Sequence, residues 1–312
     1  MRVTDIKIQI GKFAFSYVHN VEASTDWENL TNTCVIKLPA NLSLNVNKLR
    51  DLIRPGDKVE INAGYDANLN LIFKGYVAAI SPTTPIELRC EDEMYLLKQS
   101  TINDHLYNCK LSTLLKRHFN DIAINFIDAE IGDFRIENMN RAKVLDKLKE
   151  WGIHSFFRQG VLVVGKPYDA TFARKIVYHI TGTKCNVIDD NLEYRRASDI
   201  KLRVTAISLY PDGSRKEVKI GDEGGENRTL NYYNLSVNEL SKAAQRDYER
   251  MVYDGYRGSF TTFIEPFVRQ GDIVVLKSVE NSDRTGEFWV DKVTYRLGTD
   301  GFRQEIKIGP KA

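Results

Sequence analysis

The sequence predicts a mainly β fold with an α+β insertion, in which two similar small antiparallel β-barrels flank an α+β module. Three observations predict it. Short alternating runs fill residues 1–91 and return after residue 169, apolar residues at helical spacing appear between them, and one short stretch occurs twice. We therefore expect a first barrel over residues 1–98, the module over 99–168, and a second barrel with one inserted helix over 169–312.

The repeated stretch is Arg-x-Gly-Asp followed by a strand, at residues 54–57 and again at 269–272. Gly56 and Gly271 take the third position, where a type II turn requires a positive φ that a side chain disfavours. Asp57 and Asp272 can then bind nearby backbone N–H groups and start the strand. A metal or phosphate site is the functional alternative for a Gly-Asp pair, but such residues are commoner in turns, so we interpret all four as structural.

The similarity between the two copies continues downstream. The segment 75–80 resembles 286–293, with the two glycines in corresponding positions, and one more alternating run follows each, at 86–90 and 302–308. Self-similarity at this separation indicates one β-unit used twice, with other material between the copies.

The first ninety or so residues contain several short strands. Ile6, Ile8 and Ile10 alternate with polar residues, which is the pattern of a half-buried strand. Further strands are predicted at 33–38, 59–63, 69–80 and 86–90. Several short strands joined by turns are typical of a small antiparallel barrel or sandwich.

The module has two predicted helices. The first carries apolar residues at 111, 114, 115 and 119; the second carries them at 144, 145, 148 and 151. Asn138 or Asn140 can cap the second helix, and Gly152 can end it. Strands are expected at 122–126 and 134–136, and a hairpin at 153–164 with its turn at 158–160.

The last part returns to strands at 200–204, 207–209 and 217–220, with a hairpin turn at Pro211, Asp212 and Gly213. The sequence from Ser236 to Glu239 is a capping box and predicts a helix. Strands resume at 260–267, before the second Arg-x-Gly-Asp.

The strand after the second turn differs from the strand after the first. Ile273 and Val275 stand where the first copy has Lys58 and Glu60, so this strand is apolar on both faces. A strand of that kind is covered on both sides. We therefore predict Ile273 and Val275 as candidate interface residues, covered by another domain or by a partner chain.

Composition excludes several classes of protein. The 312 residues carry 44 Lys and Arg against 42 Asp and Glu, a net charge of +2, without the basic surplus usual in nucleic-acid binders. The sequence contains no run of 18 apolar residues, so we predict no membrane anchor. The N-terminus enters a strand directly, unlike a signal peptide. The scattered residues Cys34, Cys90, Cys109 and Cys185 are typical of small buried side chains in a reducing compartment, although a disulfide remains open.

Recognisable catalytic motifs are absent from the sequence. The five histidines form no His-Glu-x-x-His pair, and no nucleophile elbow, Walker loop or dinucleotide-binding glycine pattern occurs. His105 and Cys109, with Cys90 upstream, are too few and too widely spaced for a predicted zinc site. We expect a protein that is not an enzyme, with no catalytic, cofactor-binding or metal-binding residues.

The order and spacing of several motifs resemble those of the late control protein D family, the baseplate hub proteins of contractile-tailed phages. They are also similar to the N-terminal hub part of the type VI secretion spike proteins known as VgrG. The likeness covers nearly the whole chain. It is carried by the segments 54–59, 73–77, 88–98, 134–138, 145–152 and 301–306.

The resemblance implies a structural function. Such hubs are homotrimers in which each chain contributes two similar barrels, and the six barrels match a sixfold tail tube on one face and a threefold spike on the other. It implies a separate spike protein and tail tube and baseplate proteins as partners, with DNA only as passing cargo. It places the protein in the virion tail baseplate, made in the bacterial host cytoplasm.

Two other classes of function remain open at this stage. One is an OB-like barrel module that binds oligosaccharide or single-stranded nucleic acid. The other is a hydrolase that uses the acidic residues Asp189, Asp190 and Glu193 as a general acid/base pair, for which a solvated loop is the plainer interpretation.

Overall fold

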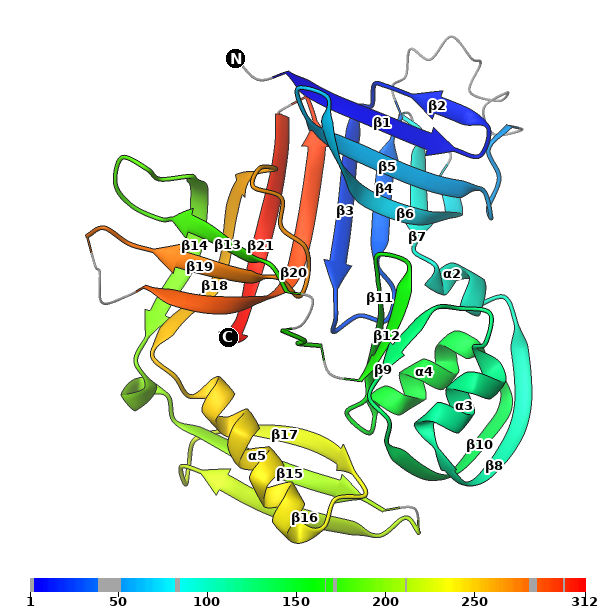
Figure 1. Ribbon diagram of the computed structural model, residues 1–312, viewed down its shortest axis with the longest axis vertical. Coiled ribbons are helices and arrows are strands. Elements are labelled where there is room, and N and C mark those ends of the chain that lie inside the picture. Colours follow the sequence, from blue (N-terminus) through cyan, green and yellow to red (C-terminus); the bar gives the residue numbers. More distant parts are fainter. Residues whose placement is uncertain are drawn as a thin grey trace.

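The computed structural model describes residues 3–38, 52–81, 85–165, 167–170, 173–210, 212–280, 285–299 and 301–312. It is mainly β with a small number of helices, as the sequence predicts (Figure 1). No helix among these residues is long and apolar enough to span a membrane.

The first repeat, here called unit one, consists of five antiparallel strands in the spatial order β3-β4-β7-β6-β5. Two further strands, β1 (Thr4–Ile10) and β2 (Phe13–Phe15), extend the sheet beyond β5. The five strands of the unit are β3 (Asn20–Asp26), β4 (Thr33–Lys37), β5 (Lys58–Tyr65), β6 (Asn68–Ser81) and β7 (Glu87–Glu91).

The second repeat, unit two, has the same strand order in β14-β18-β21-β20-β19, and every neighbouring pair is again antiparallel. Its outer strand β13 (Lys175–His179) pairs parallel with β19, whereas β1 pairs antiparallel with β5. The five strands are β14 (Val187–Arg195), β18 (Gly255–Phe263), β19 (Ile273–Lys277), β20 (Gly286–Gly298) and β21 (Gly301–Lys311).

A register irregularity occurs at the same place in both units. In unit one the pairing of β6 with β7 shifts between Val77 and Ala79, and in unit two that of β20 with β21 shifts between Val290 and Lys292. Residues of the two units can therefore be matched one to one, with Val77 equivalent to Val290. With this matching Gly75 corresponds to Phe288 and not to Gly286, whereas the ends of the two similar segments, Ile80 and Val293, do correspond.

The two units share one sheet and one core, a connection that the sequence did not predict. Strand β20 pairs antiparallel with β3, so that Lys292–Gly298 lie beside Asn20–Asp26. The result is a continuous 13-stranded sheet of described residues. Its buried side chains form a single hydrophobic cluster that includes Val21 and Ile36 from unit one and Val293 and Ile306 from unit two.

The α+β module lies between the units in sequence and has its own core. As predicted, Asn140 caps α4 (Arg141–Lys149) by accepting from the Lys143 backbone N–H at 2.8 Å, and Gly152 follows the helix with φ of +76°. Met94 and Leu97 also lie in this core, although the sequence prediction assigns residues up to 98 to the first barrel. Its other elements are α2 (Met94–Leu97), β8 (Thr101–Lys110), α3 (Leu111–His118), β9 (Ile124–Phe126), β10 (Glu130–Asn140), β11 (His154–Arg158) and β12 (Val161–Gly165).

The helix inserted in the last part is not alone. Strand β15 (Leu202–Leu209) pairs antiparallel with β16 (Arg215–Gly221) and parallel with β17 (Glu226–Tyr233), and α5 (Val237–Met251) packs on them around a third core. This insertion follows a short 3-10 helix, η1 (Ala197–Asp199). The predicted capping box of Ser236 and Glu239 is confirmed. Of the predicted hairpin turn, Pro211 lies outside the described residues.

A buried carboxyl group lies where unit one meets the module. Asp92 is 3% exposed, and its two oxygens accept from the backbone N–H groups of Asn32 and Met94, both at 3.0 Å. The side-chain amide of Asn32 donates in turn to the carbonyl of Phe157 in the module at 3.2 Å. Burial raises the pKa of Asp92 to about 7, and the two backbone hydrogen bonds oppose that rise.

This raised pKa gives a testable pH dependence. An unfolded aspartate titrates near pH 4, roughly three units lower, so the folded protein holds the Asp92 proton more tightly. Linkage then requires the Asp92 contribution to stability to fall as the pH rises from about 4 to about 7. We expect urea unfolding midpoints of the wild type to fall more steeply over this range than those of Asp92→Asn. The variant should start less stable, because an amide N–H₂ would face a backbone donor; parallel pH profiles of the two proteins would contradict the assignment.

Candidate assembly interface

The two Arg-x-Gly-Asp turns have the same backbone geometry. Gly56 and Gly271 have φ of +95° and +79°. In each turn the aspartate N–H donates to the arginine carbonyl at 3.1 Å, which is the hydrogen bond that closes a β-turn. The glycine N–H donates to Val77 in unit one and to Val290 in unit two, both at 2.8 Å, and each valine N–H returns a bond of 2.9 Å to the aspartate carbonyl.

The aspartate side chains repeat this equivalence. Asp57 Oδ2 accepts from the Arg54 backbone N–H at 2.8 Å, and Asp272 Oδ2 accepts from the Arg269 backbone N–H at the same distance. Each side chain thus holds the turn that precedes its strand. Asp57 is only half-buried, whereas Asp272 is 3% exposed. The same turn therefore lies in two different environments.

The buried carboxylate of Asp272 has a second task in unit two. Its Oδ2 forms an ion pair with Arg174 Nη2 at 2.5 Å, and its Oδ1 also accepts from the Arg174 backbone N–H at 3.3 Å. The Ile273 N–H donates to the Arg174 carbonyl at 2.8 Å. Because Arg174 directly precedes β13, these contacts hold β13 beside β19 in the parallel orientation. Arg174 is 98 residues away from Asp272 in the sequence, and no motif indicated the pair.

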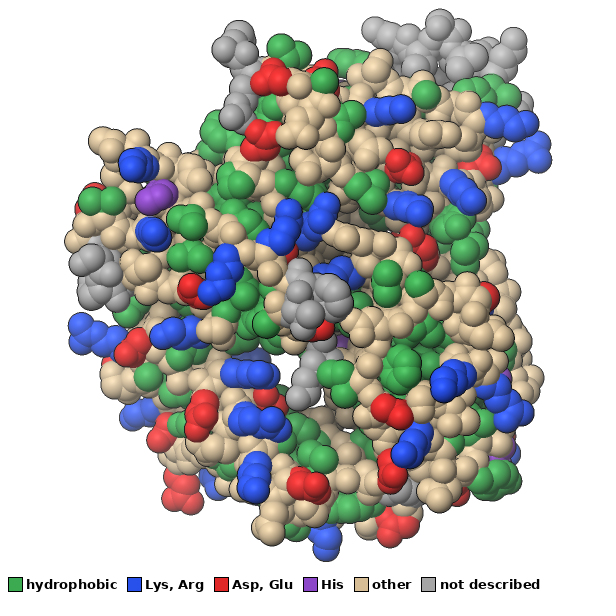
Figure 2. All heavy atoms as spheres, viewed as in Figure 1, with side chains coloured by type: hydrophobic (Ala, Val, Ile, Leu, Met, Phe, Trp, Pro, Cys, Tyr) green, Lys and Arg blue, Asp and Glu red, His purple; other side chains and the backbone are tan. Residues whose placement is uncertain are grey.

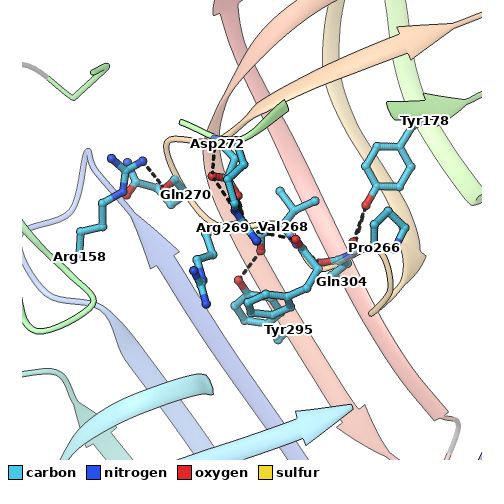
Figure 3. Close-up of polar contacts among 11 residues, drawn as sticks. Arg158, Tyr178, Pro266, Val268, Arg269, Gln270, Asp272, Tyr295 and Gln304 are labelled. Carbon is cyan, nitrogen blue, oxygen red and sulfur yellow. Dashed lines mark hydrogen bonds and ion pairs between the residues drawn. The ribbon is translucent and has the colours of Figure 1, made fainter. Parts of the chain in front are cut away.

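Buried side chains also hold the chain that leads into the second turn (Figure 3). Gln304 is fully buried; its amide donates to the carbonyl of Pro266 at 2.6 Å and accepts from the Val268 N–H at 3.2 Å. The hydroxyl of Tyr295 donates to the carbonyl of Val268 at 2.6 Å, and that of Tyr178 donates to Pro266 at 2.9 Å. Unit two therefore satisfies the polar backbone of this segment from β13, β20 and β21.

The module contacts the second turn directly. Arg158, at the end of β11, donates from Nη2 to the carbonyl of Gln270 at 2.9 Å (Figure 3). The guanidinium lies so close that a Cβ atom on Gly271 would be 1.7 Å from Nη2. Glycine at position 271 thus permits both the positive φ and the approach of Arg158.

The predicted interface residues Ile273 and Val275 differ in exposure. Ile273 is 6% exposed within the single chain and pairs across the strands with Trp289, whereas Val275 is only partly buried. Val275 lies beside Val177 of β13, which is 40% exposed. Other parts of the same chain thus already cover Ile273. The assignment of Val275 to an interface between chains stays a prediction.

The acidic residues considered for hydrolysis do not form a catalytic pair. They lie on β14, where Asp189 and Asp190 are consecutive and so point to opposite faces of the sheet. Asp189 and Glu193 share a face but are four residues apart, about 13 Å along a strand. The exposed Glu193 bonds to Arg195 at 2.7 Å, which lowers the pKa of the carboxyl. Shared protonation between two such carboxyl groups requires a much closer approach.

The metal candidates are also dispersed. Cys90 lies opposite Cys34 in the core of the sheet, and Cys109 is buried in the module core. The ring of His105 packs on Tyr107 instead. Among the residues that the structure describes, no three His, Cys, Asp or Glu side chains gather as a metal site.

A groove of about 840 Å³ crosses the shared sheet where unit one joins unit two. Its charged lining has both signs, and no aromatic side chain contributes to it among the described residues. Stacking platforms for bases or sugars need aromatic side chains beside a basic surface, so the lining does not favour the OB-like binding module. The face in Figure 2 likewise shows Lys and Arg interspersed with Asp and Glu. The charged lining residues are Glu22, Asp26, Lys292, Arg296, Glu305 and Lys307.

Alanine at the two turn glycines tests their different surroundings. Gly56→Ala should lower the free energy of unfolding by about 1–2 kcal/mol, the penalty for placing a residue with a side chain in the left-handed conformation. No steric clash adds to this penalty, because the nearest atom to the new Cβ is 3.7 Å away. Gly271→Ala should cost clearly more, because Arg158 must also leave Gln270. Gly213→Ala is the control, since Gly213 has φ of +80° and no atom within 4 Å. Chemical unfolding midpoints measure all three, and an equal loss at 56 and 271 would contradict this account of the second turn.

No family model matches the chain, and no curated protein matches it. Solved structures with a similar fold do match. The tail protein from Neisseria meningitidis MC58 has a TM-score of 0.67 at 14% identity, covering 98% of this chain and 96% of that one. The 43 kDa tail protein of prophage MuSo2 from Shewanella oneidensis has a TM-score of 0.64 at 13% identity, covering 98% and 97%.

A third solved structure comes from a different machine. It is the E. coli protein c3393, described as a component of the type VI secretion system with structural similarity to the T4 bacteriophage tail proteins gp27 and gp5. Its TM-score is 0.61 at 11% identity, with 98% of this chain and 77% of that one covered. The chain therefore has, over nearly its whole length, the fold of these phage tail and type VI secretion proteins.

Proposed function

We propose that this protein is a structural baseplate hub of a contractile phage tail, or of a prophage or related injection machine, of the late control protein D type. Three copies form a ring that adapts a sixfold tail tube to a threefold spike. The observation that carries the proposal is the internal duplication, in which two units share strand order, turn geometry and bulge position. The shared fold with solved tail proteins supports it.

The duplication provides the symmetry that such an adaptor needs. Three chains with two similar units each present six similar surfaces, which a sixfold partner can contact. The α+β module between the units and the β15–α5 insertion within unit two each occur once per chain and so repeat three times. Oligomers of soluble proteins are usually closed and cyclic, and a ring follows when a head-to-tail contact closes.

The polar groove fits the wall of a channel in this ring. The apolar face of the shared sheet is buried in the common core. The hollowed opposite face carries three basic residues, Lys292, Arg296 and Lys307, beside three acidic ones, Glu22, Asp26 and Glu305. We propose that this concave face lines the channel. Its balanced charges would let DNA pass without holding it, because affinity for DNA comes mainly from uncompensated basic residues.

The remaining parts of the proposal concern partners and location. The protein would assemble with a separate spike protein on one face and with tail tube and baseplate proteins on the other, within the virion tail baseplate. It would act without catalysis or a cofactor. The E. coli type VI secretion component and the phage tail proteins that share the fold support a place in this kind of machine.

Mass and shape test the proposal together. We expect light scattering to give three times the chain mass of 35.7 kDa as the protein concentration rises, and electron microscopy to show a ring with six similar lobes. The oligomer should dissociate on dilution, because assembly depends on protomer concentration. A monomer at every concentration, or a closed oligomer of a number other than three, would overturn the trimeric hub.

A further inference from the structure

The two units are joined inside one chain by a strand pairing whose equivalent, at the other two ends of the units, is not made within the chain. Inside, the end of β20 after its bulge pairs with β3. By the residue matching between units, β6 is equivalent to β20 and β14 is equivalent to β3. An equivalent contact would therefore join the end of β6 to β14.

Both partners of that missing contact are sheet edges among the described residues. Strand β6 pairs with β5 only up to Tyr76, so Ala79, Ile80 and Ser81 pair only with β7. Strand β14 pairs only with β18 along its nine residues. Unpaired N–H and C=O groups on such an edge are a ready template for another strand. Figure 1 shows β14 at the left of the molecule and β6 at the right, so the two edges cannot meet within one chain.

We propose that β14 of one protomer pairs antiparallel with the end of β6 of a second copy, in the register of the internal contact. Inside the chain, Lys292, Val293 and Thr294 lie opposite Asp26, Thr25 and Ser24. The equivalent residues place Ala79 opposite Arg195, Ile80 opposite Tyr194 and Ser81 opposite Glu193. The inference rests on the proposed ring and names the strands that close it.

Side chains at the two edges fit such a continuation of the core. Ile80 on β6 and both Leu192 and Tyr194 on β14 are partly buried apolar residues that pack at the margin of the shared cluster. In the internal contact the position of Ile80 is held by Val293, which is fully buried. Pairing β14 with β6 would place Ile80 and Tyr194 directly opposite, where cross-strand apolar pairs stabilise a sheet.

The contact is head-to-tail, because it joins different surfaces of the two chains. The rotation that relates unit one to unit two, applied again and again, would add further units around one axis in the same direction. A ring of six units, and hence of three chains, leaves no β14 or β6 edge open. Closure of a sheet is the one arrangement that removes its edges altogether.

Disulfide trapping tests the register. In a Cys185→Ser background, which removes the exposed native thiol, the pair Ser81→Cys and Glu193→Cys should oxidise between chains. We expect covalent dimers and trimers on a denaturing gel, with the ladder ending at three. Directly opposite residues bring their Cβ atoms to about 4.5–5.5 Å, and a small inward shift then reaches the roughly 3.5–4.5 Å of a disulfide.

Two matched controls define the outcome. Ser24→Cys with Thr294→Cys, the internal equivalent, should close within one chain and form no ladder. Ser81→Cys with Asp189→Cys is off-register by about 13 Å and should not cross-link. A trimer by light scattering that gives no 81–193 disulfide, or that cross-links equally through 189, would overturn the strand pairing but leave the hub. A monomer at all concentrations would overturn the hub and the pairing with it.

Discussion

The pairing of β3 with β20 is the contact on which the rest of the structure depends. It joins two five-strand units edge to edge, so that one hydrophobic core serves both. Without it, each unit would expose an edge strand and part of the shared hydrophobic cluster. Because the register is fixed by the buried alternation of Val21 and Ala23 opposite Leu297 and Tyr295, a slip of one residue would turn apolar side chains to water.

The two copies of the turn show how a repeat can keep its backbone and change its role. Both turns bind the same groups with nearly the same distances. In unit one the aspartate is half-buried near the end of β1. In unit two the same carboxylate is buried and paired with Arg174, and Arg158 of the module reaches the neighbouring carbonyl. Buried charges are costly unless they are paired, so the second turn depends on its partners more than the first.

The sequence predicted the elements well where local chemistry determines them. The mainly β class, the cap of α4 at Asn140 and the capping box of α5 all follow from residues close in sequence. It did not predict β8, because bulges and the left-handed residues Asn108 and Asn138 interrupt the alternation along its pairing with β10. Nor did it predict β17, which pairs parallel with β15 and has few buried side chains.

Long-range contacts explain what the sequence could not provide at the candidate interface. The turn residues were visible because they are repeated, whereas Arg158, Arg174 and Gln304 acquire their roles only when distant strands meet. The partnership of β3 and β20 was hidden for the same reason, since each strand's pattern is equally compatible with several neighbours. Ile273 is buried within the single chain, and its assignment to an interface stays a prediction.

The connections between equivalent strands differ greatly in length. Unit one passes from β3 to β4 through a short loop between Asp26 and Thr33, whereas unit two places the whole β15–α5 insertion between β14 and β18. The Ala197 N–H donates to Asp254 Oδ1 at 2.6 Å where this insertion leaves and rejoins the sheet, so its size can vary without moving either strand. In a ring of three chains, the short β3–β4 loop of unit one and the β15–α5 insertion of unit two would alternate around the ring. One surface would then look the same every 60° while the other repeats only every 120°.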